Sequence, residues 1–226
     1  MDELELKGQI IEVGLTLINT GLVEGTGGNI SARLPGAQWF YITPSGMPYH
    51  EIEPDDLVKV DLQGKIIEGK RKPSIEKDLH LGIYQEREEI NGVVHTHSLY
   101  SSAVAACRRN IPPFLDSIVA AFGGPIEVAD YARPGSRELA ENARSKLAVK
   151  NGVLLANHGA IGIGCTLAKA LETAQLIEKA AKTFIFASVL GGPIPLSSAE
   201  IADELNFLAK NYGQKKLSLQ QDSENR

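Results

Sequence analysis

Apolar residues recur at three- and four-residue intervals along much of the chain, and this spacing predicts amphipathic helices. The first helix is expected over residues 4–18, with Gly21 just beyond its end. Another begins at Ser74, its expected N-cap, and has Glu76 in its first turn. Four more helices follow the same pattern, over residues 100–109, 136–149, 167–190 and 198–212.

Shorter apolar runs, bounded by glycine or polar turns, predict strands. They cover residues 30–34, 39–42, 57–61, 65–68, 93–97 and 153–158. Gln63-Gly64 separates the third and fourth runs and predicts a hairpin, so the first half of the sheet should be antiparallel. Helices alternate with these strands, which predicts an α/β fold in which helices cover both faces of a mixed sheet.

No repeat, Pro/Ser-rich linker or low-complexity stretch divides the 226 residues. We therefore expect a single domain over residues 1–226, with a disordered polar tail over residues 213–226. The hydrophobic content of 43% is enough to form a full core. The formal net charge of −5 argues against nucleic acid or an anionic membrane as the main partner.

The cysteines and the start of the chain favour a cytoplasmic protein with reduced thiols. Cys107 and Cys165 are too few for a disulfide framework. The acidic start Met1-Asp2-Glu3-Leu4 lacks the basic and apolar regions of a signal peptide. No apolar run reaches the length of a transmembrane helix.

Three of the five histidines lie at the ends of predicted strands. His95 and His97 close the run 93–97, and in an extended strand two such residues point to the same side. His158 closes the run 153–158 and is followed by glycine. A lone histidine is usually an ordinary core or surface residue. Three imidazoles brought together by two strand ends, with one position left open, favour a catalytic divalent-metal site instead.

Two loops and one helix start have the chemistry of an anion site. Residues 25–29 contain three glycines, whose backbone amides can approach an anion closely, and a strand follows them, unlike the dinucleotide-binding motif. Residues 43–46 offer hydroxyls and a further glycine amide, although each loop alone could be a plain turn. The helix start at Ser74 also attracts phosphate. His80, four residues after Glu76, is interpreted as the structural partner of that carboxylate.

Five motifs occur in order along the chain: Gly25-Thr26-Gly27-Gly28-Asn29, Ile42-Thr43-Pro44-Ser45-Gly46, Lys72-Pro73-Ser74-Ile75-Glu76, His95-Thr96-His97 and Asn157-His158-Gly159. Together they closely resemble the class II aldolase family typified by L-fuculose-1-phosphate aldolase. That family also contains ribulose-phosphate epimerases, sugar-phosphate dehydratases and the adducin head. The resemblance runs from about residue 3 to residue 212. It implies a three-layer α/β/α fold around a central mixed, mostly antiparallel sheet.

The resemblance also implies a metal-dependent lyase. His95, His97 and His158 resemble the ligands of one zinc ion per subunit, for which manganese or cobalt could substitute. Glu76 resembles the residue that binds the resting metal and acts as the base once substrate displaces it. The implied reaction is cleavage of a ketose 1-phosphate, similar to L-fuculose 1-phosphate or a 5-deoxy sugar, into dihydroxyacetone phosphate and an aldehyde. The implied assembly is a fourfold-symmetric homotetramer with interfacial active sites.

By the same resemblance, six residues are expected to bind the phosphate of the substrate: Thr26, Gly28, Asn29, Ser45, Gly46 and Ser74. One departure concerns this set. Ile75 stands where the family often has a second serine, which removes one hydroxyl from the phosphate site. We also expect the apolar side chain of Ile75 to help raise the pKa of the neighbouring Glu76 carboxyl, because a base near pKa 4.3 is weak.

A second departure concerns the group that protonates the aldehyde oxygen. The fuculose-phosphate branch has a tyrosine after the segment that corresponds to Ile111-Pro112, and residues 114–117 of this chain contain none. Tyr212 matches a family tyrosine near the C-terminus that helps cover the site, and a phenol is protonated at neutral pH. We favour Tyr212 as the donor. The alternatives are Asp116, Ser117 and Tyr131.

Two rival functions follow from the same family. An epimerase, dehydratase or decarboxylase could act on a related sugar phosphate or acid with a similar site. A non-catalytic, adducin-like oligomerisation module is the other rival, and the presence of three histidines with Glu76 argues against it.

Overall fold

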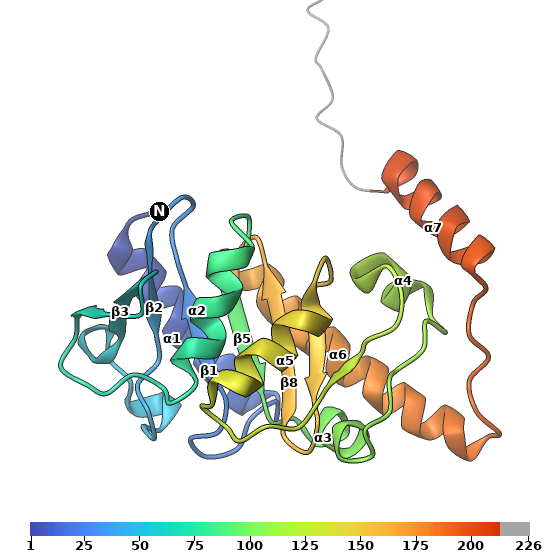
Figure 1. Cartoon of the computed structure of the whole chain (residues 1–226), viewed down its shortest axis with the longest axis horizontal. Coiled ribbons are helices and arrows are strands. Elements are labelled where there is room, and N and C mark those ends of the chain that lie inside the picture. The colour runs from blue at the N-terminus through green and yellow to red at the C-terminus, as the bar shows by residue number, and fades with distance from the viewer. Residues whose placement is uncertain (213–226) are drawn as a thin grey trace, which may run out of the picture.

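The fold is built on one eight-stranded sheet (Figure 1). The computed structural model describes residues 1–212, so the predicted disorder of residues 213–226 lies outside the described part. The strands have the order β4-β3-β2-β1-β5-β8-β7-β6, and neighbours pair antiparallel except for the parallel pair β6 and β7. Their bounds are β1 Asn29–Ala32, β2 Trp39–Ile42, β3 Val58–Asp61, β4 Ile66–Glu68, β5 Gly92–Thr96, β6 Val128–Ala129, β7 Gly152–Leu155 and β8 Gly159–Gly164.

Helices cover both faces of this sheet, which confirms the predicted three-layer α/β/α architecture. On one face lie α2 (Lys77–Glu86) and α5 (Arg137–Leu147). On the other lie α1 (Glu3–Asn19), α3 (Leu99–Ala106), α4 (Asp116–Phe122) and α6 (Leu167–Val189). The short 3-10 helices η1 (Tyr49–Glu51) and η2 (Pro54–Asp56) precede β3.

Strand β5 shows how the two cores are separated. Val93 packs with residues of α2 and α5, whereas Val94 packs with residues of α1 and α6. Successive side chains of a strand point to opposite faces, so a strand covered on both sides is apolar throughout. The same alternation turns His95 and His97 toward the α2 face.

The last helix, α7 (Ser198–Asn211), packs against α4 at the edge of the molecule and has no buried residue (Figure 1). Within residues 1–212, α7 and the short η2 are the only helices that contribute no residue to the three buried apolar clusters that cover the two faces of the sheet. Within the same residues, no helix combines the length and the apolar character needed to cross a bilayer.

Strand β8 was not among the predicted strands, and its glycines are the reason. A Cβ on Gly162 would lie 2.6 Å from the backbone nitrogen of Ala174, and one on Gly164 would lie 2.5 Å from that of Ala170. Only glycine therefore allows α6 to pack so closely on the sheet. Glycine is rare inside strands, so this segment has the composition of a loop. Helix α4 and the two-residue strand β6 were not predicted either.

The start of α2 differs from the prediction that Ser74 is its N-cap. The helix begins at Lys77, and Glu76 is the N-cap residue without a side-chain capping bond. The Ser74 Oγ instead accepts a hydrogen bond from the Glu76 N–H, at 3.2 Å. The carboxylate of Glu76 is thereby left free of the helix end and turns into the functional site.

Candidate functional site

The sheet brings three histidines to one edge. His95 lies near the end of β5, His97 follows that strand, and His158 lies in the tight turn between β7 and β8. Because β5 pairs antiparallel with β8, with Thr96 opposite Ala160, this turn lies beside the end of β5. Asn157 has a φ of 56°, a left-handed conformation that asparagine tolerates better than most residues.

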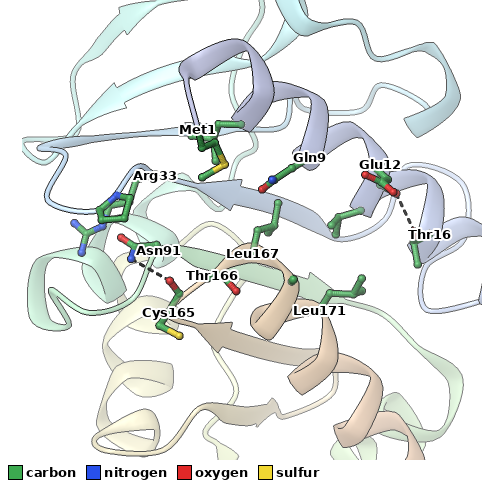
Figure 2. Close-up of a pocket in the computed structure, with 14 residues that line it drawn as sticks. Met1, Gln9, Glu12, Thr16, Arg33, Asn91, Cys165, Thr166, Leu167 and Leu171 are labelled. Carbon is green, nitrogen blue, oxygen red and sulfur yellow. Dashed lines mark hydrogen bonds between the residues drawn. The ribbon is translucent and has the colours of Figure 1, made fainter. Parts of the chain in front are cut away.

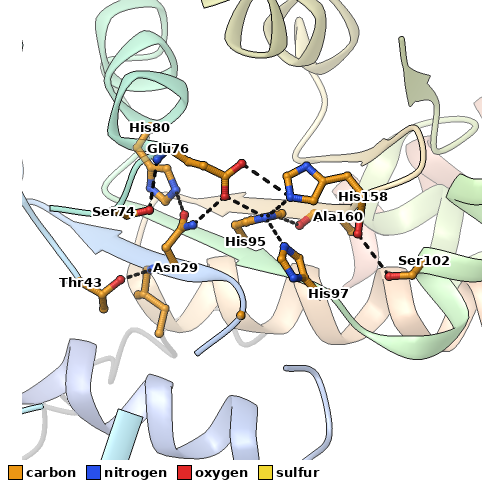
Figure 3. A network of polar contacts seen from close by, with 12 residues as sticks. Asn29, Thr43, Ser74, Glu76, His80, His95, His97, Ser102, His158 and Ala160 are labelled. Atoms are coloured by element: carbon orange, nitrogen blue, oxygen red, sulfur yellow. Dashed lines mark hydrogen bonds and ion pairs between the residues drawn. The ribbon is translucent and has the colours of Figure 1, made fainter. Parts of the chain in front are cut away.

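These histidines converge with Glu76 on one point (Figure 3). One potential ligand atom from each of the four side chains lies within 4.8 Å of the others. The Nε2 of His95 is 2.9 Å from that of His97 and 3.3 Å from that of His158. The Glu76 oxygens lie 3.2 Å from His95 Nε2 and 3.7 Å from His158 Nε2. The structure therefore assembles the four residues that the sequence predicted as a metal site.

The hydrogen bonds of this cluster leave lone pairs that a cation could bind. His95 Nδ1 lies 2.9 Å from the carbonyl oxygen of Ala160 and must donate to it, so the Nε2 of the neutral ring carries a lone pair. That lone pair points at two further imidazole nitrogens. Glu76 Oε1 and His158 Nδ1 are buried and have no hydrogen-bond partner among the described residues. Three imidazoles and a carboxylate are a donor set typical of zinc and similar divalent ions.

Two glycines make room for the His97 ring. A Cβ on Gly27 would lie 3.1 Å from His97 Nδ1. A Cβ on Gly159 would lie 2.1 Å from the Thr96 carbonyl oxygen and 3.1 Å from His97 Cδ2. The loop before β1 and the turn after His158 can therefore enclose the ring only because both positions lack a side chain.

Burial and mutual repulsion keep two of the imidazoles neutral. Burial, followed by the nearby His95, lowers the pKa of His97 and of His158 to about 4. Neutral imidazoles have the lone pairs that metal binding requires. Burial alone would lower the pKa of His95, but the Glu76 carboxylate raises it above its ordinary value.

The expectation that Ile75 helps to raise the pKa of the Glu76 carboxyl is wrong. Burial would raise the pKa of this carboxyl, but His95 and His158 together lower it well below its usual range. The side chain of Ile75 is 65% exposed and points to solvent, so it supplies no apolar cover. At neutral pH Glu76 is an ionised carboxylate, suited to hold a cation.

The Glu76 carboxylate is also held by Asn29, and this contact corrects the interpretation of His80. Asn29 Nδ2 donates to Glu76 Oε2 at 2.8 Å, and Asn29 Oδ1 lies 2.5 Å from His80 Nε2 (Figure 3). His80 is a structural residue, as expected, but its partner is Asn29 and not Glu76. Asn29 is 4% exposed, so the residue predicted to bind phosphate also holds the carboxylate.

The predicted anion-binding residues come from three loops that the backbone ties together. Thr43 N donates to the Ile30 carbonyl at 3.0 Å, and Ser45 N donates to the Lys72 carbonyl at 3.0 Å. Ser74 N donates to the Thr43 carbonyl at 3.0 Å. The hydroxyl of Ser74 is buried, whereas three of the other predicted residues are exposed: Thr26, Ser45 and Gly46. Gly28 and Gly46 have positive φ values of 69° and 67°, which favour glycine.

Comparison with known proteins gives the family. Residues 8–185 match the Class II Aldolase and Adducin N-terminal domain family. The chain belongs to the class II aldolase family. It is 39% identical over 205 residues to the 5-deoxy-D-ribulose 1-phosphate aldolase of Bacillus thuringiensis serovar kurstaki, covering 90% of this chain and 93% of the relative. It is 38% identical over 214 residues to the L-fuculose phosphate aldolase of Escherichia coli K12, covering 94% and 98%.

A solved structure of L-fuculose 1-phosphate aldolase has the same fold as this chain. It superposes with a TM-score of 0.87 at 35% identity, covering 91% of this chain and 96% of that one. The protein is thus a class II aldolase, a lyase that breaks a carbon–carbon bond by retro-aldol chemistry.

The candidate proton donors of this aldolase lie outside the histidine cluster. Tyr212 follows α7 and is 82% exposed. Figure 1 shows α7 beyond α4, apart from the end of β5 and the start of β8, where the histidines lie. Asp116 and Ser117 begin α4, and Tyr131 is half-exposed. The fold of one chain therefore does not bring Tyr212 to the cluster of Glu76 and the three histidines.

Glu178 is a supporting residue that the sequence did not reveal. It lies on α6 and accepts hydrogen bonds from the N–H groups of Tyr100 and Ser101, at 2.9 and 2.8 Å. These groups belong to the first turn of α3, which starts two residues after His97. The position of Glu178 in the middle of a long helix gives no sequence signal for this role.

A separate cavity of about 500 Å³ lies between α1 and the start of α6 (Figure 2). Leu6, Val13 and Leu171 form part of its apolar wall, and Cys165 lies at its rim. None of its lining residues belongs to the histidine cluster or to the anion loops. This cavity is therefore not the site of the aldol chemistry.

Proposed function

We propose that this aldolase cleaves a ketose 1-phosphate into dihydroxyacetone phosphate and an aldehyde. The observation that carries the proposal is the position of Glu76, whose carboxylate meets three imidazoles beside the tied loops 25–29, 43–46 and 72–75. Such a site can hold a divalent ion and a phosphorylated substrate together. The names of the relatives support a sugar with an L-fuculose or 5-deoxypentulose skeleton.

The metal is proposed to be zinc, one ion per chain, held by His95, His97 and His158, with manganese or cobalt as substitutes. The ion would act as a Lewis acid and stabilise negative charge on the substrate oxygens. The chain supplies the geometry: the β5 end and the β7–β8 turn hold the imidazoles, and the Ala160 carbonyl fixes the tautomer of His95.

Glu76 is proposed to move the proton. In cleavage, the bond between carbons 3 and 4 breaks, the hydroxyl on carbon 4 gives its proton to the aldehyde-side residue, which returns it to solvent, and the bonding electrons stay with carbon 3. Glu76, which must first take up a proton from solvent, then gives it to carbon 3, and this completes dihydroxyacetone phosphate. In synthesis, the carboxylate removes the same proton. Its lowered pKa makes it a weak base, so the acidity of that carbon must come from the bound ion.

The phosphate is proposed to lie against the three loops. Thr26, Asn29 and Ser45 would donate from their side chains, and Gly28 and Gly46 from their backbone amides. The Ser74 Oγ accepts from the Glu76 N–H, which leaves its own hydrogen to donate. Such donors replace the water around an anion.

The active unit is proposed to be a homotetramer in the cytoplasm. Each chain would contribute one catalytic domain. Support comes from exposed apolar residues at the end of α6, in the segment after it and on α7: Phe186, Val189, Leu190, Ile194 and Phe207. Contact between copies would cover these side chains. It could also bring Tyr212 of one copy to the site of its neighbour, where a phenol can protonate the aldehyde oxygen. Asp116, Ser117 and Tyr131 are the alternative donors.

Incubation of the purified protein with a panel of sugar 1-phosphates tests the function. The panel includes 5-deoxy and methylthio pentuloses, and the assay detects dihydroxyacetone phosphate. Release of that product supports the proposal. An unchanged carbon count indicates an epimerase, loss of water a dehydratase, and carbon dioxide a decarboxylase. Metal-free protein with no turnover on any substrate would point to an adducin-like module.

A further inference from the structure

A ladder of buried polar side chains joins α2 to β1 behind the metal cluster. Glu76 is the N-cap residue of α2, and His80 and Tyr84 follow it at four-residue intervals, which places the three side chains on one face. Asn29 and Ser31 lie two apart on β1 and so point to the same face of the sheet. The helix residues and the strand residues meet in alternation, and the last contact of the ladder is the one between Asn29 and Glu76.

The orientation of the Asn29 amide follows from its two partners. If its oxygen faced Glu76, two oxygens would lie 2.8 Å apart with no hydrogen between them. The nitrogen of the amide must therefore face Glu76 Oε2. Its oxygen faces His80, and the His80 Nε2 must carry a hydrogen and donate it.

The rest of the ladder has only one consistent arrangement of hydrogens. With Nε2 protonated in a neutral ring, His80 Nδ1 accepts from the hydroxyl of Ser31, 2.6 Å away. Ser31 Oγ in turn accepts from the hydroxyl of Tyr84 at 2.8 Å. Each hydrogen-bond donor of the ladder therefore points along it toward Glu76. The ring is fully buried, and burial, with the nearby His95 as a further cause, lowers the pKa of His80 to about 3, in agreement with a neutral imidazole.

We propose that His80 is a positioning residue that holds the nitrogen of Asn29 toward Glu76 and thereby fixes the carboxylate at the metal end of the site. His80 touches neither the substrate nor the metal ligands in this arrangement, so it acts through Asn29. Its effect on metal binding is independent of the substrate, whereas its effect on the aldol reaction rests on the proposed function. Residues that orient metal ligands in this way typically change metal affinity or activity by about 10- to 100-fold.

Two amide variants separate this role from simple packing. Glutamine at position 80 can place an N–H₂ group near the position of His80 Nε2 and keep the bond to Asn29. Asparagine is too short and can replace only the Nδ1 side, toward Ser31. Both variants are polar and smaller than histidine. The matched control Ile83→Val lies on the same helix, and its side chain packs into the apolar cluster on the α2 face.

The measurement is the affinity of metal-stripped full-length protein for Co²⁺, followed by visible absorbance. We expect His80→Asn to weaken binding by about 10- to 100-fold. His80→Gln and Ile83→Val should stay within about threefold of the wild type, since neither disturbs the contact of Asn29 with Glu76. The effect of His80→Asn should largely disappear in an Asn29→Ala background, because the two residues act in series.

Three results would overturn the inference: wild-type Co²⁺ affinity in His80→Asn, equal losses in both amide variants, or full additivity with Asn29→Ala. If His80→Asn does not fold, the comparison of His80→Gln with Asn29→Ala decides, and loss of affinity in His80→Gln counts against the inference. Solvent deuterium exchange into dihydroxyacetone phosphate is measured in parallel. A wild type that binds Co²⁺ without exchange contradicts the proposed function, while the Co²⁺ series still decides the role of His80.

Discussion

Glu178 offers a test of how the fold supports the metal cluster from a distance. Its carboxylate binds the first turn of α3: Oε1 accepts from Tyr100 N at 2.9 Å, and Oε2 accepts from Ser101 N at 2.8 Å and from Ser101 Oγ at 2.6 Å. The negative charge also lies at the helix end that favours it. Glu178→Gln changes one oxygen to an N–H₂ group, so at least one N–H of α3 would face another donor.

The cost can be estimated from these contacts. A hydrogen bond to a charged group contributes about 1.5–3 kcal/mol, and a charge at a helix N-terminus about 0.3–1 kcal/mol. Because the contacts share one side chain and are not additive, we expect a loss of about 2–4 kcal/mol. For a chain of this size, each kcal/mol lowers Tm by about 2–4 °C, so Tm should fall by about 4–16 °C.

Thermal and urea unfolding of Glu178→Gln measure this loss, and Co²⁺ titration measures its effect on His97, which precedes α3. Glu172→Gln is the matched control, since Glu172 lies on the same helix and makes only an exposed ion pair with Lys169. That variant should differ from the wild type by less than about 1 kcal/mol. Equal Tm values for the two variants would refute the reasoning.

The remaining predictions concern the site itself. His158→Ala should lose both the bound divalent ion and activity, as measured by elemental analysis and turnover; active wild type without metal would contradict it. Glu76→Gln should keep its fold and most of its metal but lose solvent deuterium incorporation into dihydroxyacetone phosphate, because an amide cannot act as a base. Ser74→Ala should raise KM more than it lowers kcat, by the equivalent of about 1.5–3 kcal/mol, and equal activity on phosphorylated and unphosphorylated ketose would count against a phosphate site there. The pKa of His80 is about 3 in the folded chain and 6.5 in the unfolded chain, so the unfolded chain binds more protons between these two values. The stability that the neutral His80 contributes is therefore complete above pH 6.5 and is lost as the pH falls toward 3. In His80→Gln, urea unfolding should therefore depend less on pH in this window, by up to about 1.4 kcal/mol per pH unit; an unchanged dependence would show that His80 does not titrate in this way.

Local patterns predicted much of this fold because they act over a few residues. The strand period placed His95 and His97 on one side, and helical spacing located α5 and α6 to within a few residues. Contacts between distant segments were not predictable in the same way. Asn29 and Glu76 lie 47 residues apart, and Ser101 and Glu178 lie 77 apart, so nothing in either neighbourhood indicates the bond.

Local propensity also failed where packing overrides it. The glycines of β8 have a weak preference for strand, yet the close approach of α6 requires them. Ser74 is a good N-cap residue by composition, but Glu76 occupies that position because its carboxylate is held by Asn29 and lies against His95. The three histidines came together as predicted because they lie at or next to the ends of strands. The role proposed for Tyr212 depends on a contact between copies of the chain, which no local pattern describes.

The glycines of β8 have a consequence for how this enzyme can evolve or be redesigned. A methyl group at Gly162 or Gly164 would push α6 away from the sheet, and α6 carries Glu178, which holds the start of α3 beside His97. Substitutions at these buried positions would then act on the histidine cluster through α6 and α3. Libraries that seek new aldehyde specificity should keep these two positions fixed and place their diversity in the exposed loops.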